Sequence, residues 1–303
     1  MSWRMADIKH IPRLLKGAFA ELMANDPLRM AGATAFFTTF ALPPILLIII
    51  QVLGLVFDPR TISRELLQEL ETVIGPASVR QVIGVLIAFR RMSQDWLLTS
   101  AGFLFLLFVA TTLFRVIKSS LNQIWKIRLT GKVSFGQQLR SRLVAVVVIL
   151  VTGVLFVITL VAEGAQAFLG SHVSKFSPLA AIYLNSALNY VISLLVVTVW
   201  FALLFRYLPD GRQEWNVTLT GAFVTGLLFN IGKLLIRWLL NRSNISSIYG
   251  ASGSIVLLLL FVFYSSLILY YGAAFTKVWG TYRRKPIKLL SHAIHYRLVQ
   301  EPY

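Results

Sequence analysis

The sequence has no cysteine and few acidic residues, and both shortages exclude classes of chemistry. Without cysteine, the protein can form no disulfide, thiolate metal site or thiol nucleophile. Only 12 acidic residues stand against 29 lysines and arginines. Among the four histidines, only His292 and His295 share a helical spacing, and no cluster of carboxylates lies near them. We therefore expect no metal site and no cofactor.

Charged residues as a whole are also scarce. They make up 14% of the 303 positions, whereas soluble domains usually contain about 25%. Hydrophobic residues make up 57%, which is more than a water-soluble fold of this size can bury. The composition therefore predicts a polytopic inner-membrane protein, which crosses the membrane several times. We expect no cleaved signal peptide, because the first residues lack a basic region followed by a short apolar core.

Six apolar runs are each long enough to cross a hydrocarbon core of about 30 Å. They are residues 33–57, 96–116, 143–161, 184–205, 217–238 and 255–279. Most are apolar on all sides, as helices in contact with lipid must be. The sequence therefore predicts an all-α fold, a bundle of about six transmembrane helices. No low-complexity linker divides the chain, so we expect residues 1–303 to form a single membrane domain.

Lysine and arginine are unevenly distributed among the segments outside these runs. They concentrate in residues 1–30, 117–142 and 280–303, whereas basic and acidic residues balance in residues 58–95. Cytoplasmic segments carry such a basic excess, so we expect both termini in the cytoplasm. The net charge of +17 then indicates topology and suits an anionic lipid surface. Nucleic acid is not an expected partner.

Two further segments are amphipathic without being long enough to span. In residues 1–30, apolar side chains recur at helical spacing, so this segment either rests on the cytoplasmic interface or caps the bundle. In residues 58–95, Ile62 and Leu66 begin one apolar face, and a break at Gly75 separates it from a second face. We expect an extracytoplasmic helical hairpin that covers the mouth of the bundle.

The fifth run carries a row of polar side chains on one face. Its members follow at steps of three, four and four residues: Asn230, Lys233, Arg237 and Asn241. Ionisable groups inside a membrane cost about 2.5–3.5 kcal/mol on insertion scales. Either the two cations snorkel to the outer interface, or they form an amide-flanked pocket for a phosphate or carboxylate. Glu163, at the same end of the third run, is the candidate internal partner for such a pocket.

Other polar residues and prolines interrupt the remaining runs. Asn185, Asn189 and Ser193 follow at four-residue steps in the fourth run, so they lie on one face. Such a row most often joins helices by hydrogen bonds, and a substrate path is the alternative. In the first run, Pro43 and Pro44 each remove a backbone donor, so we predict a hinge with a bend of more than about 20°, or a break. Arg115, with Lys118, lies at the inner end of the second run, where snorkelling is expected.

Several short segments, spread from the first run to the last, carry a resemblance to a known family. They are residues 31–37 (AGATAFF), 41–44 (ALPP), 121–125 (LNQIW), 206–210 (RYLPD), 249–254 (YGASGS) and 271–276 (YGAAFT). In their order and spacing they resemble the YihY/BrkB family of bacterial inner-membrane proteins, once labelled ribonuclease BN.

The resemblance implies six helices, cytoplasmic termini and a transport-like or envelope-related role, including links to virulence and serum resistance. It brings no established catalytic residues. The family often has a glutamate where this chain has Ala274, so a coupling role for that carboxylate does not carry over. The ribonuclease label has no support, because the acids are dispersed over loops rather than grouped as phosphodiester hydrolysis usually requires. We expect no enzymatic activity.

The sequence favours a transporter or flippase-like protein that moves an anionic lipid or amphiphile. The alternative is a non-transporting envelope scaffold whose polar rows only hold helices together. A lateral, polar-lined cavity favours transport, whereas a tightly packed interior favours the scaffold. Membrane lipids are the expected partners, and self-association into a homo-oligomer stays open.

Overall fold

The computed structural model describes residues 10–92, 96–130, 135–173, 177–242, 253–290 and 293–296. Its helices are α2 (Ile11–Met23), α3 (Pro27–Leu53), α4 (Pro59–Ile74), α5 (Pro76–Met92), α6 (Trp96–Ile124), α7 (Phe135–Val173), α8 (Pro178–Tyr207), α9 (Trp215–Arg242) and α11 (Gly253–Tyr282). Four short strands form two antiparallel pairs, β1 (Ile127–Leu129) with β4 (Ala293–His295) and β2 (Gly211–Arg212) with β3 (Lys288–Leu289).

Five helices of the described chain are long and apolar enough to cross a membrane, namely α3, α7, α8, α9 and α11. They correspond to five of the six predicted runs. The remaining run, residues 96–116, lies within α6, and many side chains in its first half are outside the described residues. The predicted all-α, multi-span membrane fold is therefore confirmed. The two strand pairs are an addition that no sequence pattern indicated.

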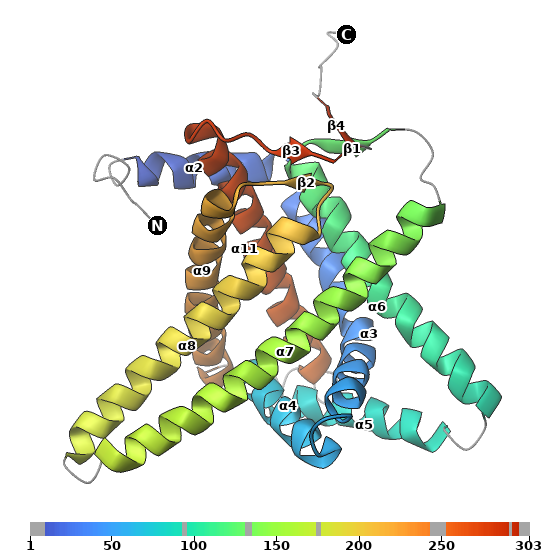
Figure 1. The fold of residues 1–303 in the computed structure, drawn as a ribbon, viewed down its shortest axis with the longest axis vertical. Coiled ribbons are helices and arrows are strands. Elements are labelled where there is room, and N and C mark those ends of the chain that lie inside the picture. The colour runs from blue at the N-terminus through green and yellow to red at the C-terminus, as the bar shows by residue number, and fades with distance from the viewer. Residues whose placement is uncertain are drawn as a thin grey trace.

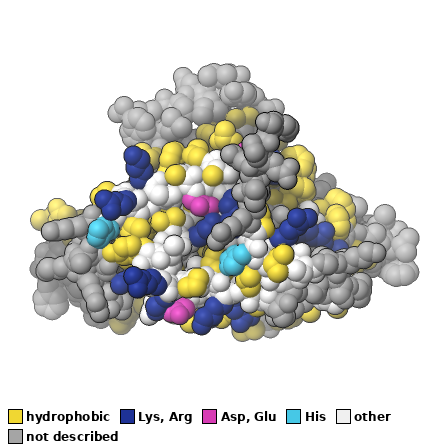
Figure 2. All heavy atoms as spheres, turned by 90° about the horizontal axis from the view of Figure 1, so that it is seen from above, with side chains coloured by type: hydrophobic (Ala, Val, Ile, Leu, Met, Phe, Trp, Pro, Cys, Tyr) yellow, Lys and Arg dark blue, Asp and Glu magenta, His cyan; other side chains and the backbone are white. Residues whose placement is uncertain are grey.

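The long helices connect two distinct ends of the molecule (Figure 1). One end carries α2 and all four strands, and we call it the strand end. The other carries α4 and α5. The first and last described segments, α2 and β4, thus lie at the same end. Seen from above, the strand end shows several separate groups of lysine and arginine side chains and few acidic ones (Figure 2).

Helix α2 covers part of the strand end rather than standing apart from it. Leu14 and Ala18 are buried in one cluster with Phe275 and Trp279 of α11. Glu21 of α2 forms an ion pair with a lysine of α11, at an O–N distance of 2.8 Å. Of the two alternatives for the amphipathic amino-terminal segment, the structure therefore shows a cap packed on the bundle.

The predicted hairpin between the first two long runs is present as α4 and α5. The chain turns between them at Gly75, whose φ of 81° is a conformation that glycine adopts without strain. Ile74 and Val79, on either side of the turn, are buried against Leu258 and Val262 of α11. The hairpin therefore covers the end of the bundle opposite the strands.

Helix α3 runs without interruption from Pro27 to Leu53, with both Pro43 and Pro44 inside it. The predicted break is therefore not found, because the helix continues on both sides of the missing donors. The hydroxyl of Thr39, one turn before Pro43, donates to the carbonyl of Ala35 at 3.0 Å. The predicted bend and hinge role of the two prolines stay predictions.

Helices α9 and α11 approach each other through reciprocal pairs of small residues. A Cβ atom added at Gly221 of α9 would overlap the side chain of Thr276 of α11. In the same way, a Cβ atom at Gly272 of α11 would overlap the side chain of Thr225 of α9. Each glycine therefore leaves room for a threonine of the other helix, and this permits the close helix packing typical of membrane proteins.

Candidate functional site

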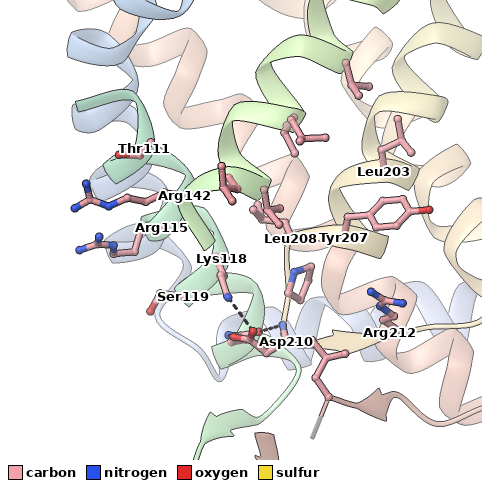
Figure 3. A pocket seen from close by; sticks show the side chains of 18 of the residues that line it. Thr111, Arg115, Lys118, Ser119, Arg142, Leu203, Tyr207, Leu208, Asp210 and Arg212 are labelled. Atoms are coloured by element: carbon pink, nitrogen blue, oxygen red, sulfur yellow. Dashed lines mark hydrogen bonds and ion pairs between the residues drawn. The ribbon is translucent and has the colours of Figure 1, made fainter. Parts of the chain in front are cut away.

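A cavity of about 680 Å³ lies at the strand end, between α6, α7, α8 and the segment that follows α8. Its volume is within the range of about 300–1,000 Å³ that is usual for small-molecule sites. It is lined by Thr111, Arg115, Lys118, Ser119, Asn122, Leu129, Arg142, Leu143, Val144, Val147, Val148, Val151, Trp200, Leu203, Tyr207, Leu208, Pro209, Asp210, Arg212 and Leu290. Figure 3 shows most of these side chains.

One helical face supplies most of the polar lining. Arg115, Lys118, Ser119 and Asn122 follow at steps of three, one and three along α6, so they lie on the same side of that helix. Arg142 of α7 joins them from a separate element, and Figure 3 shows it on the same side of the cavity as Arg115. The cationic groups therefore come from two helices that border the same space.

An ion pair lies in the polar part of the cavity. The Nζ atom of Lys118 is 2.8 Å from Oδ1 of Asp210, and the aspartate side chain is only 4% exposed. Asn122 binds Asp210 twice: its Nδ2 donates to Oδ2 at 2.8 Å, and its Oδ1 accepts from the backbone N–H at 2.9 Å. The carbonyl of Asp210 also accepts from the N–H of Leu290 at 3.1 Å. These bonds fix the segment after α8 and the carboxyl-terminal strand segment onto α6.

The cavity carries a strong excess of positive charge. Of the lining side chains that the structure describes, four are cationic, and Asp210 is the one carboxylate among them. Within the described part of the chain, Arg115, Arg142 and Arg212 have no acidic partner at salt-bridge distance, whereas Lys118 is paired with Asp210. The cavity therefore has an uncompensated charge that a negatively charged ligand would balance.

The rest of the lining is apolar. Val147 and Val151 of α7 face the cavity together with Trp200 and Leu203 of α8. The indole N–H of Trp200 donates to the hydroxyl of Thr152 at 3.0 Å, which satisfies the donor and holds the ring. One continuous space thus joins a cationic part to an apolar wall.

The cavity lies where two apolar spans reach the strand end. The apolar part of α7 begins at Arg142, and that of α8 ends at Tyr207, and both of these residues line the cavity. Leu143 and Val147, which also line it, are each more than half exposed. The cavity therefore lies at the boundary between the polar and the apolar zones of the molecule.

A second cavity of about 410 Å³ shares Arg212 with the first. Glu214 lines it and forms an ion pair with Lys285 at 2.5 Å. The hydrogen bond from Lys285 lowers the pKa of the Glu214 carboxyl below its ordinary value. Arg206 lies over the ring of Trp215, 5.2 Å from its centroid. This cavity is more polar in its lining and has fewer apolar walls than the first.

Comparison with known proteins places the chain in a family. The sequence profile described as virulence factor BrkB matches residues 18–292. The chain belongs to the BrkB family. A membrane protein of Vibrio atlanticus, named UPF0761, is 26% identical to this BrkB-family chain over 265 residues, which cover 85% of the chain and 80% of the relative.

Other relatives of this BrkB-family chain carry the same name. The protein from Tolumonas auensis is 30% identical over 61% of the chain and 59% of its own length. The one from Chlorobium chlorochromatii is 27% identical over 83% of the chain, and the matched part is 56% of that relative. The chain thus spans little more than half the length of some relatives. No solved structure matches.

In this BrkB-family protein, the polar row of α9 and its expected partners do not line either cavity described above. Asn230 instead accepts a hydrogen bond from Ser193 of α8 at 3.0 Å and donates to the carbonyl of Gly226 at 3.0 Å. Lys233 is partly buried, and the side chains of Arg237 and Asn241 lie outside the described residues. An anion site on α9 therefore stays a prediction.

The remaining predicted site residues lie toward the end of the molecule opposite the strands. The carbonyl of Asn185 accepts a hydrogen bond from Gln166 at 2.7 Å, which links α8 to α7. Glu163 and Asn189 are exposed. None of these three residues lines the cavity between α6, α7 and α8. Arg115 and Lys118 line it instead, and the sequence had indicated these two only as snorkelling groups.

Proposed function

We propose that this protein binds an anionic lipid or amphiphile in the cavity between α6, α7 and α8 and moves it across the inner membrane. The observation that carries the proposal is the union, in one cavity, of an apolar wall with guanidinium groups that have no acidic partner among the described residues. A charged headgroup and a hydrocarbon chain need both of these surroundings at once. The position of the cavity at the ends of two apolar spans suits such a ligand.

The chemistry of each part supports the same ligand. Guanidinium groups form paired hydrogen bonds with phosphate and carboxylate oxygens, and these charge-assisted bonds are stronger than neutral ones. Arg115 of α6 and Arg142 of α7 offer such donors from two different helices. Valine and tryptophan side chains on α7 and α8 would cover a chain that extends toward the middle of the membrane. The basic excess at the strand end assigns this end, with both termini, to the cytoplasm in the proposal.

A scaffold function is the second candidate. The hydrogen bond between Ser193 and Asn230 joins α8 to α9, as a purely structural polar row would. The close approach of α9 and α11 also favours a rigid part of the bundle. These contacts hold α8, α9 and α11 together without a ligand, as a scaffold requires. Neither proposal includes a catalysed reaction.

The proposal is tested by lipid movement in reconstituted vesicles. Wild-type protein is compared with the double variant Arg115→Gln/Arg142→Gln, and Arg128→Gln is the matched control because this exposed arginine of β1 lies outside the cavity lining. A fluorescent anionic lipid is followed as an external quencher reaches it. We expect movement with wild type and with the control, and its loss in the double variant. Equal rates for all three proteins, or no movement above protein-free vesicles, would contradict the proposal.

A further inference from the structure

We infer that the α6–α7 part of the cavity selects amphiphiles that end in a phosphomonoester over those with a phosphodiester or carboxylate headgroup. This inference rests on the proposed function and specifies its substrate class. It depends on the number of charges and donors that α6 and α7 present. The groups involved are Arg115, Lys118 and Ser119 of α6 and Arg142 of α7.

The charges of this part of the cavity match a doubly charged group. Arg115 and Arg142 contribute one positive charge each, and the charge of Lys118 is balanced by Asp210 at 2.8 Å. Arg212 is on the other side of Asp210 in Figure 3 and is counted separately. A phosphomonoester carries a charge of about −1.5 to −2 at pH 7. A phosphodiester or a carboxylate carries only one negative charge and would leave part of the excess unbalanced.

The donors of this part also match a group with three free oxygens. Each guanidinium presents a planar fork that binds two oxygens at once. The hydroxyl of Ser119, one turn after Arg115 on the same face of α6, adds a single donor. A phosphomonoester offers three terminal oxygens to these donors, whereas a phosphodiester offers two. Two forks and a hydroxyl are therefore better satisfied by the monoester.

The ion pair of Lys118 and Asp210 sets the boundary of this headgroup site. Asn122 holds both the side chain and the backbone of Asp210, so the carboxylate is fixed in place. A fixed negative charge next to Lys118 repels an anion that would settle on the Arg212 side of the pair. The ligand phosphate is thereby directed toward Arg115 and Arg142, with its chain along the apolar wall.

The test measures competition for the purified protein in neutral detergent. A fluorescent phosphatidic acid analogue is bound first and is then displaced by phosphatidic acid, phosphatidylglycerol, a fatty acid or inorganic phosphate. At pH 7.5 we expect phosphatidic acid to displace it at a concentration about tenfold lower than phosphatidylglycerol. The preference should shrink at pH 5, since the second proton of a phosphomonoester dissociates near pH 6.

Single variants connect the preference to the named residues. The quantity compared is the concentration of phosphatidylglycerol needed to displace the probe, divided by that of phosphatidic acid. Arg142→Gln should reduce this ratio, Arg142→Lys should restore part of it, and Arg128→Gln should leave it unchanged. If Arg142→Gln does not yield folded protein, Ser119→Ala gives the same test with a milder change. Equal displacement by the two lipids would overturn the inference and leave the proposed function standing. Displacement by none of the lipids would overturn both the inference and the proposed function. Displacement by inorganic phosphate as strong as by phosphatidic acid would show that a lipid is not required, and it would overturn the assignment to amphiphiles.

Discussion

Lys118 of α6 and Asp210, which follows α8, form an ion pair 2.8 Å long within the strand-end cavity. They are 92 positions apart in the sequence and come from segments that are not consecutive. The pair does two things at once. It joins α6 to the segment after α8, and it neutralises one of the four cations that line the cavity. The pair therefore contributes to the stability of this end of the molecule and lowers the net positive charge of the cavity.

Removing the charge of Asp210 should destabilise the protein. Asp210→Asn leaves the ammonium of Lys118 without its counter-charge, and loss of one partner of a buried pair costs about 3–5 kcal/mol. Because the side chain of Lys118 is 21% exposed, we expect the free energy of unfolding to fall by an amount near or below the lower limit of this range. Thermal unfolding of the purified protein measures it. The double variant Lys118→Met/Asp210→Asn should recover most of the stability, and an Asp210→Asn protein as stable as wild type would show that the pair contributes nothing.

The close contact between α9 and α11 predicts that alanine destabilises the protein at Gly272, and Gly32 of α3, which lies outside this contact, is the control. Gly272→Ala places a methyl group where the side chain of Thr225 lies, and overpacking of this kind costs about 1–3 kcal/mol. Gly32→Ala in α3 meets no atom within 4 Å and should be neutral or stabilise by up to about 1 kcal/mol. Unfolding temperatures of the two variants, measured side by side, test the packing. Similar temperatures for both would mean that the helices are not in close contact.

The pair of Glu214 and Lys285 should give a stability contribution that depends on pH. The lowered pKa of Glu214 means that the folded state favours the ionised carboxylate. The contribution is therefore complete above the ordinary pKa of glutamate and is lost as the pH falls through the lowered pKa. Wild type should unfold at a higher temperature than Glu214→Gln at pH 7, and the difference should vanish at strongly acidic pH. A difference in unfolding temperature that is unchanged at low pH would contradict a contribution from the ionised carboxylate of Glu214.

The orientation can be tested with single cysteines, since the natural chain has none. Arg60→Cys, at an exposed position of α4, should react with an impermeant thiol reagent in intact cells. Arg128→Cys, at an exposed position of β1, should react only after the membrane is opened. The control is the unmodified chain, which should not react. The reverse pattern would place the strand end outside the cytoplasm.

The sequence was sufficient for the parts of the fold that depend on local pattern. Apolar runs predicted the long helices, and the break at Gly75 predicted the hairpin of α4 and α5, because length, periodicity and turn residues are properties of neighbouring positions. The role expected of the polar row on α9 stays a prediction. Ser193 of α8 belongs to the row of the fourth run that was expected to join helices, and its hydroxyl donates a hydrogen bond to Asn230 of α9.

The candidate site could not be predicted in the same way. Arg115 and Lys118 lie at the end of an apolar run, where snorkelling is the usual explanation, and nothing nearby in the sequence contradicts it. Their environment is decided by Asp210 and Arg142, which come from other segments and reach the cavity only through the packing of α6, α7 and α8. The spacing of polar residues along α6 was a usable signal, but only the fold shows which space that face borders.

Photochemical labelling tests the central claim most directly, because it locates the bound lipid. Wild-type protein is reconstituted with an anionic lipid that carries a light-activated group in its chain, and the labelled peptides are identified by mass spectrometry. We predict labelling around Val147 and Val151 of α7 and around Leu203 of α8, with a marked decrease in the Arg115→Gln/Arg142→Gln variant. Labelling centred on α9 near Lys233, or spread over the lipid-facing surface and unchanged in the variant, would contradict a lipid site in this cavity.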